Sequence, residues 1–157
     1  MPIGFSIRRA VNDDVPAIRA VLLSVRSEYG VLGEIGANDA DLDDLELNYF
    51  RGGGCFEVVE DGTKRIVGCA GLYPLNPCRA ELCKMYLEKS ARGQGLGKRL
   101  LEGVLAAARR SGFREVWLET NSALTEATTL YKKYGFRPID AEHLLPRCDV
   151  AYLLGLG

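Results

Sequence analysis

The sequence has 157 residues, of which 47% are hydrophobic and 26% are charged, the balance of a soluble globular domain. Acidic and basic residues nearly cancel, to a net charge of −1, which excludes the basic surface that a general nucleic-acid-binding protein needs. Apolar runs are only a few residues long, so neither a membrane-spanning helix nor a secretory signal is predicted. We expect a single cytoplasmic domain over residues 1–157, with no membrane partner.

The hydrophobic pattern predicts a succession of strands and helices along the chain. In order, the predicted elements are a strand over residues 5–11, a helix that contains Ile18, Leu22 and Val25, a helix over 39–50, strands over 55–60, 65–75 and 81–87, a helix from 96 that ends at Gly112, a strand over 115–120, a helix over 122–134, and strands over 136–139 and 150–154. Three consecutive strands before the main helix speak against a doubly wound parallel sheet. We therefore expect an α+β fold with a mixed, mainly antiparallel sheet flanked by about four helices.

The helix that begins at residue 96 is the best defined. Its apolar stripe consists of Leu96, Leu100, Leu101, Val104, Leu105 and Ala108. In the strand before it, alternation predicts that Glu81, Cys83, Met85 and Leu87 share one face.

Cysteine and histidine are too few and too scattered to predict a metal site or a disulfide framework. The five cysteines form no C-x-x-C pair, and the chain has one histidine. Most of the cysteines lie in strand-like runs, as is typical of small buried side chains in a reducing compartment. No metal cofactor is expected.

A glycine-rich stretch, Arg92-Gly93-Gln94-Gly95-Leu96-Gly97, lies between a predicted strand and the main helix. Glycines let backbone N–H groups approach a ligand closely, and the helix N-terminus adds partial positive charge. This combination predicts a site for phosphate oxygens. An ordinary turn is the alternative.

Two other phosphate-binding motifs fit this stretch poorly. A P-loop needs glycine at position 92 and serine or threonine at position 99, and both positions hold arginine. A dinucleotide-binding loop needs G-x-G-x-x-G, whereas the spacing here is G-x-G-x-G. Glu119 superficially suits the ribose carboxylate of that motif, so a nicotinamide-dependent oxidoreductase is kept as a third hypothesis.

Two motifs together resemble the GNAT superfamily of N-acetyltransferases. The first is R-x-x-G-x-G at Arg92, Gly95 and Gly97, and the second is A-x-x-L-Y-x-x-x-G-F over residues 127–136. In that family the first motif begins the helix that cradles the pyrophosphate of acetyl-CoA, and the second lies beside the thioester. The resemblance runs from Glu81 to Phe136. It implies a GNAT-like fold and acetyl transfer from acetyl-CoA to a primary amine.

The resemblance also implies roles for individual residues. Glu81 is the expected general base, directly or through water, because an alkyl ammonium with a pKa near 10.4 must lose a proton before it attacks. Tyr131 is the expected general acid, since protonation helps a thiolate to leave. Backbone N–H groups of residues 85–87 are expected to polarise the thioester carbonyl. The implied cofactor-binding residues are Met85, Tyr86, Leu87, Arg92, Gly93, Gln94, Gly95, Leu96, Gly97 and Lys98.

A purely structural role is the alternative for each of these residues. Glu81 can be a solvated strand end, Tyr131 a core aromatic residue and Lys98 a surface charge. Leu124 occupies a position where many relatives carry asparagine, which weakens the comparison with enzymes that acetylate protein N-termini.

The acceptor is not identified by the sequence. The resemblance places its pocket near residues 29–50 and 143–150, where an acidic cluster over residues 39–46 either attracts a cationic amine or caps a helix. His143 has no assigned role. The acceptor is expected to be a small molecule or a peptide, and a homodimer and the acyl-chain preference stay open. The alternative function is a non-catalytic acyl-CoA-binding sensor or assembly module.

Overall fold

The structure is a computed structural model that describes residues 4–30, 37–141, 144 and 148–157. Seven strands form one sheet in the order β1-β2-β3-β4-β5-β7-β6. The strands are β1 (Ser6–Arg9), β2 (Cys55–Glu60), β3 (Ile66–Pro74), β4 (Arg79–Leu87), β5 (Glu115–Thr120), β6 (Arg137–Ile139) and β7 (Val150–Gly155). The helices are α1 (Val15–Glu28), α2 (Leu96–Arg110) and α3 (Thr125–Lys133), with short helical turns η1 (Asn12–Asp14), η2 (Ala37–Asp43), η3 (Glu46–Phe50) and η4 (Lys89–Ala91). The predicted α+β class is confirmed, and so is the predicted order of elements, except for the helix over residues 39–50.

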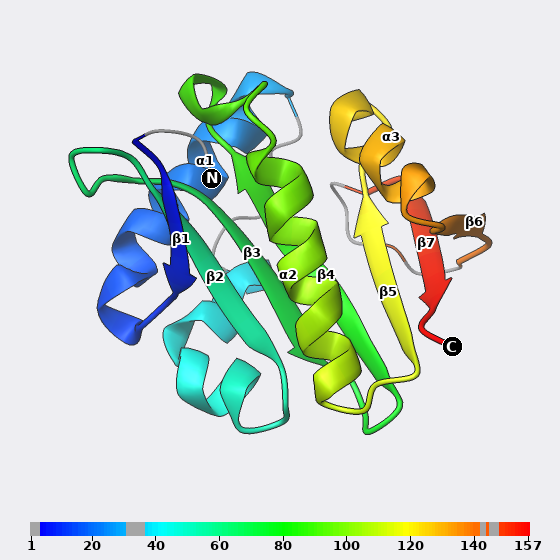
Figure 1. Cartoon of the computed structure of the whole chain (residues 1–157). Coiled ribbons are helices and arrows are strands. Elements are labelled where there is room, and N and C mark those ends of the chain that lie inside the picture. The colour runs from blue at the N-terminus through cyan, green and yellow to red at the C-terminus, as the bar shows by residue number, and fades with distance from the viewer. Residues whose placement is uncertain (1–3, 31–36, 142–143, 145–147) are drawn as a thin grey trace.

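The sheet divides between β4 and β5. The other neighbouring strands pair antiparallel, whereas β4 and β5 pair in parallel over three residue pairs, Arg79–Glu81 with Glu115–Trp117. Beyond Glu81 the two strands separate, as Figure 1 shows. This separation opens the sheet near the carboxyl end of β4.

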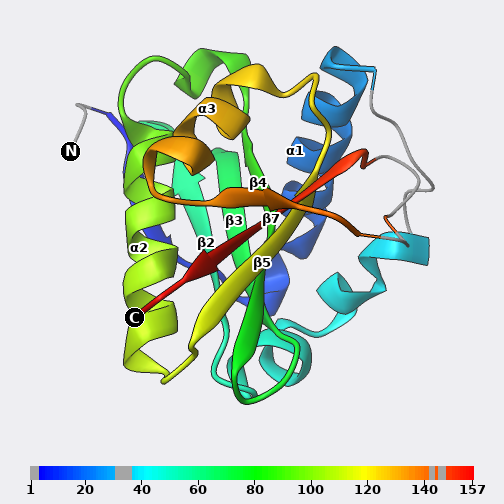
Figure 2. The same ribbon diagram turned by 90° about the vertical axis from the view of Figure 1, so that its right-hand side faces the viewer.

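Helices cover both faces of the first half of the sheet (Figure 2). The predicted apolar stripe of α2 is buried against one face, in a cluster that includes Leu72, Leu82 and Val116. On the other face, α1 buries Ile18 and Leu22 and their apolar neighbours in a second cluster. The amphipathic pattern of both helices therefore accounts for the layered core.

The predicted helix over residues 39–50 is wrong. The chain forms two short helical segments, η2 and η3, and Asp39 has a non-helical φ of −120°. The buried side chain of Asp39 is held by Arg26 of α1, at 2.7 Å. This inward ion pair competes with continuous helical geometry.

The predicted alternation along β4 is also wrong after Cys83. The register with β3 shifts, so that Lys84 and Met85 lie opposite the single residue Ala70. Lys84 has a φ of 53°, which marks a β-bulge. As a result Cys83 packs in the cluster beneath α1, whereas Met85 and Leu87 pack in the cluster beneath α2.

None of the helices in the described ranges is long and apolar enough to cross a membrane.

Candidate active site

The glycine-rich stretch forms a loop at the start of α2. Gly93 and Gly95 have φ values of 76° and 79°, a left-handed conformation that favours glycine. Gly95 is the N-cap of α2, and a Cβ built on either glycine would meet nothing within 4 Å. The space beside the loop is therefore open at these two glycines, and the N–H groups of the first turn of α2, which have no acceptor within the helix, favour an anion there.

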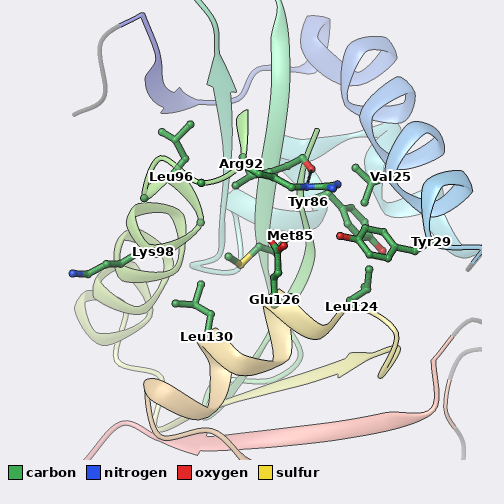
Figure 3. A pocket seen from close by; sticks show the side chains of 15 residues that line it. Val25, Tyr29, Met85, Tyr86, Arg92, Leu96, Lys98, Leu124, Glu126 and Leu130 are labelled. Atoms are coloured by element: carbon green, nitrogen blue, oxygen red, sulfur yellow. Dashed lines mark hydrogen bonds between the residues drawn. The ribbon is translucent and has the colours of Figure 1, made fainter. Parts of the chain in front are cut away.

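A pocket of about 300 Å³ connects this loop with the opening beside β4. Figure 3 shows side chains from α1, β4, α2 and α3 around it. The predicted residues 85–87 line it, and so do all of residues 92–98 except Gln94. The exposed Gln94 side chain instead lies 3.4 Å from the carbonyl oxygen of Ser90. The wall is mainly apolar, which suits an extended organic chain better than a bare ion.

The two sides of the pocket differ in charge. Lys98 extends from α2 away from the other labelled side chains, and Glu126 lies at the start of α3 (Figure 3). Leu124, at the position where many GNAT relatives carry asparagine, also lines the pocket. Whatever binds at that point meets an apolar side chain in place of an amide.

Arg92 ties the glycine loop to two other elements. Its Nε donates to the carbonyl oxygen of Leu87 at 3.0 Å, and its guanidinium forms a bidentate pair with Glu28 at the end of α1. It also lies 5.3 Å from the ring centroid of Tyr29. The hydrogen bond from Arg92 lowers the pKa of Glu28. The sequence motif identified Arg92, but its spacing carries no signal for Glu28 or Tyr29.

Tyr131 is buried in the apolar cluster beneath α2. It is 4% exposed, and its ring lies near those of Phe136 and Tyr152, at 5.7 and 6.4 Å. Burial raises the pKa of its hydroxyl, and the neighbouring Tyr86 and Cys83 raise it further. Tyr131 therefore stays protonated at neutral pH, the state that a proton donor needs.

Glu81 is half-buried at the point where β4 and β5 separate. It lies opposite Tyr73 of β3 and Trp117 of β5, in the last pair of the parallel ladder. Neither Glu81 nor Tyr131 is among the described residues that line the pocket by the glycine loop. Both side chains instead interact electrostatically with Cys83, two residues before Met85 in β4.

The acidic cluster is largely taken up by ion pairs. Asp39 and Asp41 lie 3.4 and 2.9 Å from the ammonium of Lys84, and Asp43 pairs with Arg19 at 2.8 Å. Asp44 behaves as the predicted cap, because it accepts the N–H of Leu47, three residues on, at 3.1 Å. His143 and the adjoining part of the expected acceptor region lie outside the described residues.

Three of the cysteines are thiols whose pKa is raised by burial. Burial raises the pKa of Cys55, Cys69 and Cys83 to about 12, so these thiols stay protonated at neutral pH. Cys78 is exposed, in contrast to the expected burial. Within the described ranges no group of three or more His, Cys, Asp or Glu side chains is arranged to hold a metal ion.

The sheet is mixed and opens between β4 and β5, a glycine loop lies at the N-terminus of a helix, and an apolar pocket lies between the loop and the opening. This is the architecture of an acyl-group transferase. Residues 22–136 match the model of the Acetyltransferase (GNAT) family, and the chain belongs to this family. It is an acetyltransferase.

Known proteins resemble the chain in sequence and in fold. The uncharacterized N-acetyltransferase YjgM of Escherichia coli (strain K12) is 39% identical over 140 residues, which are 85% of this chain and 83% of the relative. A GNAT-family acetyltransferase from Staphylococcus aureus Mu50 has the same fold, with a TM-score of 0.89, 24% identity and coverage of 98% and 99%. The structure of yncA from Salmonella typhimurium with its cofactor acetyl-CoA has a TM-score of 0.73, 20% identity and coverage of 98% and 95%.

Proposed function

We propose that the protein transfers the acetyl group of acetyl-CoA to a primary amine of a small molecule or peptide, by direct attack of the amine on the thioester. The observation that carries the proposal is the pocket that runs from the glycine loop to the opening beside β4. Its two ends offer donors for a diphosphate and a route to the reacting centre.

The loop and the first turn of α2 fit a diphosphate. Backbone N–H groups of residues 93–98 would bind its oxygens, and no side chain at Gly93 or Gly95 obstructs them. Leu87, Leu96 and Leu130 supply apolar contacts for the chain that links the diphosphate to the thioester. This assignment needs no metal ion.

The bulge in β4 directs a backbone donor toward the pocket. The carbonyl oxygen of Lys84 lies 3.1 Å from the Sγ of Cys69, whose thiol donates to it from the α1 side of the sheet. In a trans peptide group the N–H points opposite to the C=O, so the N–H of Met85 points toward the other face. A donor there stabilises the negative charge that develops on the thioester carbonyl oxygen.

Glu81 and Tyr131 handle the protons in this proposal. Glu81 accepts a proton from the incoming ammonium, directly or through water, and the free amine attacks the carbonyl carbon. As the carbon–sulfur bond breaks, Tyr131 donates its hydroxyl proton to the departing sulfur. The acetylated nitrogen then releases its extra proton, which reprotonates Tyr131 through solvent, and Glu81 returns its own proton to solvent. The raised pKa of Tyr131 supports this role, because the hydroxyl is protonated when the thiolate leaves.

The test is a matched pair of glycine substitutions in α2 and its cap. Gly95→Ala forces a side chain into a φ of 79°, whereas Gly103→Ala lies within the helix and meets nothing within 4 Å. Calorimetry should show CoA binding weakened about tenfold or more by Gly95→Ala and unchanged by Gly103→Ala. A thiol-release assay with acetyl-CoA and a panel of amines tests transfer. CoA binding without thiol release across the panel would favour the non-catalytic alternative.

A further inference from the structure

The β-bulge at Lys84 needs an explanation, because a lysine rarely adopts a left-handed backbone. Its φ is 53°, and two residues of β4 stand against one of β3. Such strain persists only where the surroundings hold it in place. The contacts of the Lys84 side chain show what holds it.

Lys84 is anchored by buried ion pairs on the α1 side of the sheet. Its side chain is 6% exposed, and the ammonium lies 2.9 Å from Asp41 and 3.4 Å from Asp39. Asp39, 1% exposed, also forms a bidentate pair with Arg26, at 2.7 and 3.2 Å. Among the described residues, these contacts join two cations, Arg26 and Lys84, to two anions, Asp39 and Asp41.

The same group contacts β4 on both sides of the bulge. Arg26 donates from Nε to the hydroxyl oxygen of Tyr86 at 3.3 Å. The hydroxyl of Tyr49 donates to Asp41 and lies 3.4 Å from the Sγ of Cys83. The residues before, at and after the bulge are thus all attached to α1, η2 and η3.

We infer that Lys84 is a positioning residue for acetyl transfer: its buried ion pairs hold the β4 bulge, and the bulge keeps the N–H of Met85 directed at the thioester carbonyl. This inference rests on the proposed function. It also assigns the acidic residues Asp39 and Asp41 to the geometry of the reacting centre, in place of attraction of a cationic acceptor.

The decisive comparison is between alanine and glycine at position 84. Both substitutions remove the ammonium, but only glycine adopts a left-handed φ without strain. Each is combined with Asp41→Asn, so that Arg26 and Asp39 remain a balanced pair and Tyr49 keeps an acceptor. The variants Lys84→Ala/Asp41→Asn and Lys84→Gly/Asp41→Asn then differ only in how well they tolerate the bulge.

We expect the glycine variant to have a kcat at least about tenfold above that of the alanine variant. The dissociation constant for CoA should stay within about twofold of wild type in both, because the diphosphate site is separate. In ¹H–¹⁵N spectra, exchanging CoA for acetyl-CoA should shift the Met85 amide in wild type and less in the alanine variant. Equal kcat and equal Met85 shifts in the two folded variants would overturn the inference.

Two further variants complete the test. Lys64, with a φ of 70°, is an exposed lysine in the turn between β2 and β3, so Lys64→Ala and Lys64→Gly should leave kcat unchanged. If the double variants do not fold, Asp41→Asn alone should lower kcat by about threefold or more without changing CoA affinity, and an unchanged kcat contradicts the inference. Failure of the proposed function appears separately, as wild-type protein that does not bind CoA or release its thiol.

Discussion

Arg92 donates from Nη2 to Oε1 of Glu28 at 2.8 Å, in a bidentate pair that connects the glycine loop with the end of α1. The positive charge of the family motif is therefore partly neutralised by a residue 64 positions earlier in the chain. This pairing has a consequence for cofactor affinity, because a diphosphate in the loop would lie close to both side chains.

Replacing Glu28 with glutamine should tighten CoA binding. The amide still hydrogen-bonds to Arg92, but the local positive charge rises. The affinity for an anionic ligand should therefore rise about two- to fivefold at low salt. Calorimetry at two salt concentrations measures the effect, which should shrink at high salt. Glu115→Gln, in the pair with Arg79 at the opposite end of β4, serves as the control and should leave affinity unchanged. Weaker binding by Glu28→Gln would show that the pair serves only to hold the loop.

Tyr131→Phe should reduce kcat by about 10²–10⁴, the contribution typical of general acid–base catalysis, with CoA affinity unchanged. Because the pKa of Tyr131 is raised, ionisation of this hydroxyl should not limit the rate below about pH 10, its ordinary pKa. The matched control is Tyr134→Phe, since the Tyr134 hydroxyl donates to Glu102 at 2.9 Å and has no role in the proposed reaction. Steady-state rates over pH measure both effects, and equal rates for the two variants would remove Tyr131 from the mechanism.

Arg26→Met should destabilise the fold by about 3–5 kcal/mol, the usual cost of breaking a buried ion pair on one side only. Arg26 is fully buried, and among the described residues of this group the change leaves two carboxylates beside one ammonium. Adding Asp39→Asn restores the charge balance and should recover at least half of the loss. Urea unfolding measures the free energies. A double variant that is less stable than Arg26→Met would contradict this account of the group.

The protein should lose stability in acid partly through Asp14. The hydrogen bonds from Arg8, at 2.8 and 2.9 Å, are the largest cause that lowers the pKa of Asp14. The stabilisation is present above the unfolded pKa, about 3.9, and is lost as the pH falls through the lower folded value. In Asp14→Asn the slope of unfolding free energy against pH should be smaller below about pH 4. Urea titrations at pH 2 to 5 test this, and an unchanged slope would contradict it.

Local pattern was enough to predict most of the fold. Helical and strand periodicity identified the elements in order, and the bounds of β2 and β5 agree with the predicted residues. The glycine spacing located the loop and, with the second motif, the family. These features depend on neighbours in the chain, so the sequence alone carries them.

Long-range polar contacts account for what the sequence did not reveal. The bulge at Lys84 arises where a lysine on β4 meets aspartates more than forty positions earlier, and nothing in the run Cys83-Lys84-Met85 marks it. The pairing of Arg92 with Glu28 is hidden for the same reason. The helix predicted over residues 39–50 is interrupted because the side chain of Asp39 points inward to a buried arginine. This contact exists only in the folded chain, so the local sequence does not reveal it.

Because the parallel ladder between β4 and β5 is short, few backbone hydrogen bonds hold the middle of the sheet together. Only three residue pairs join these two strands, so the half of the sheet that ends at β4 and the half that begins at β5 are weakly connected. A ligand bound between the two halves would contact β4 on one side and α3 on the other, and so would link them. Occupancy should therefore stiffen the whole molecule, and the melting temperature should climb with coenzyme concentration.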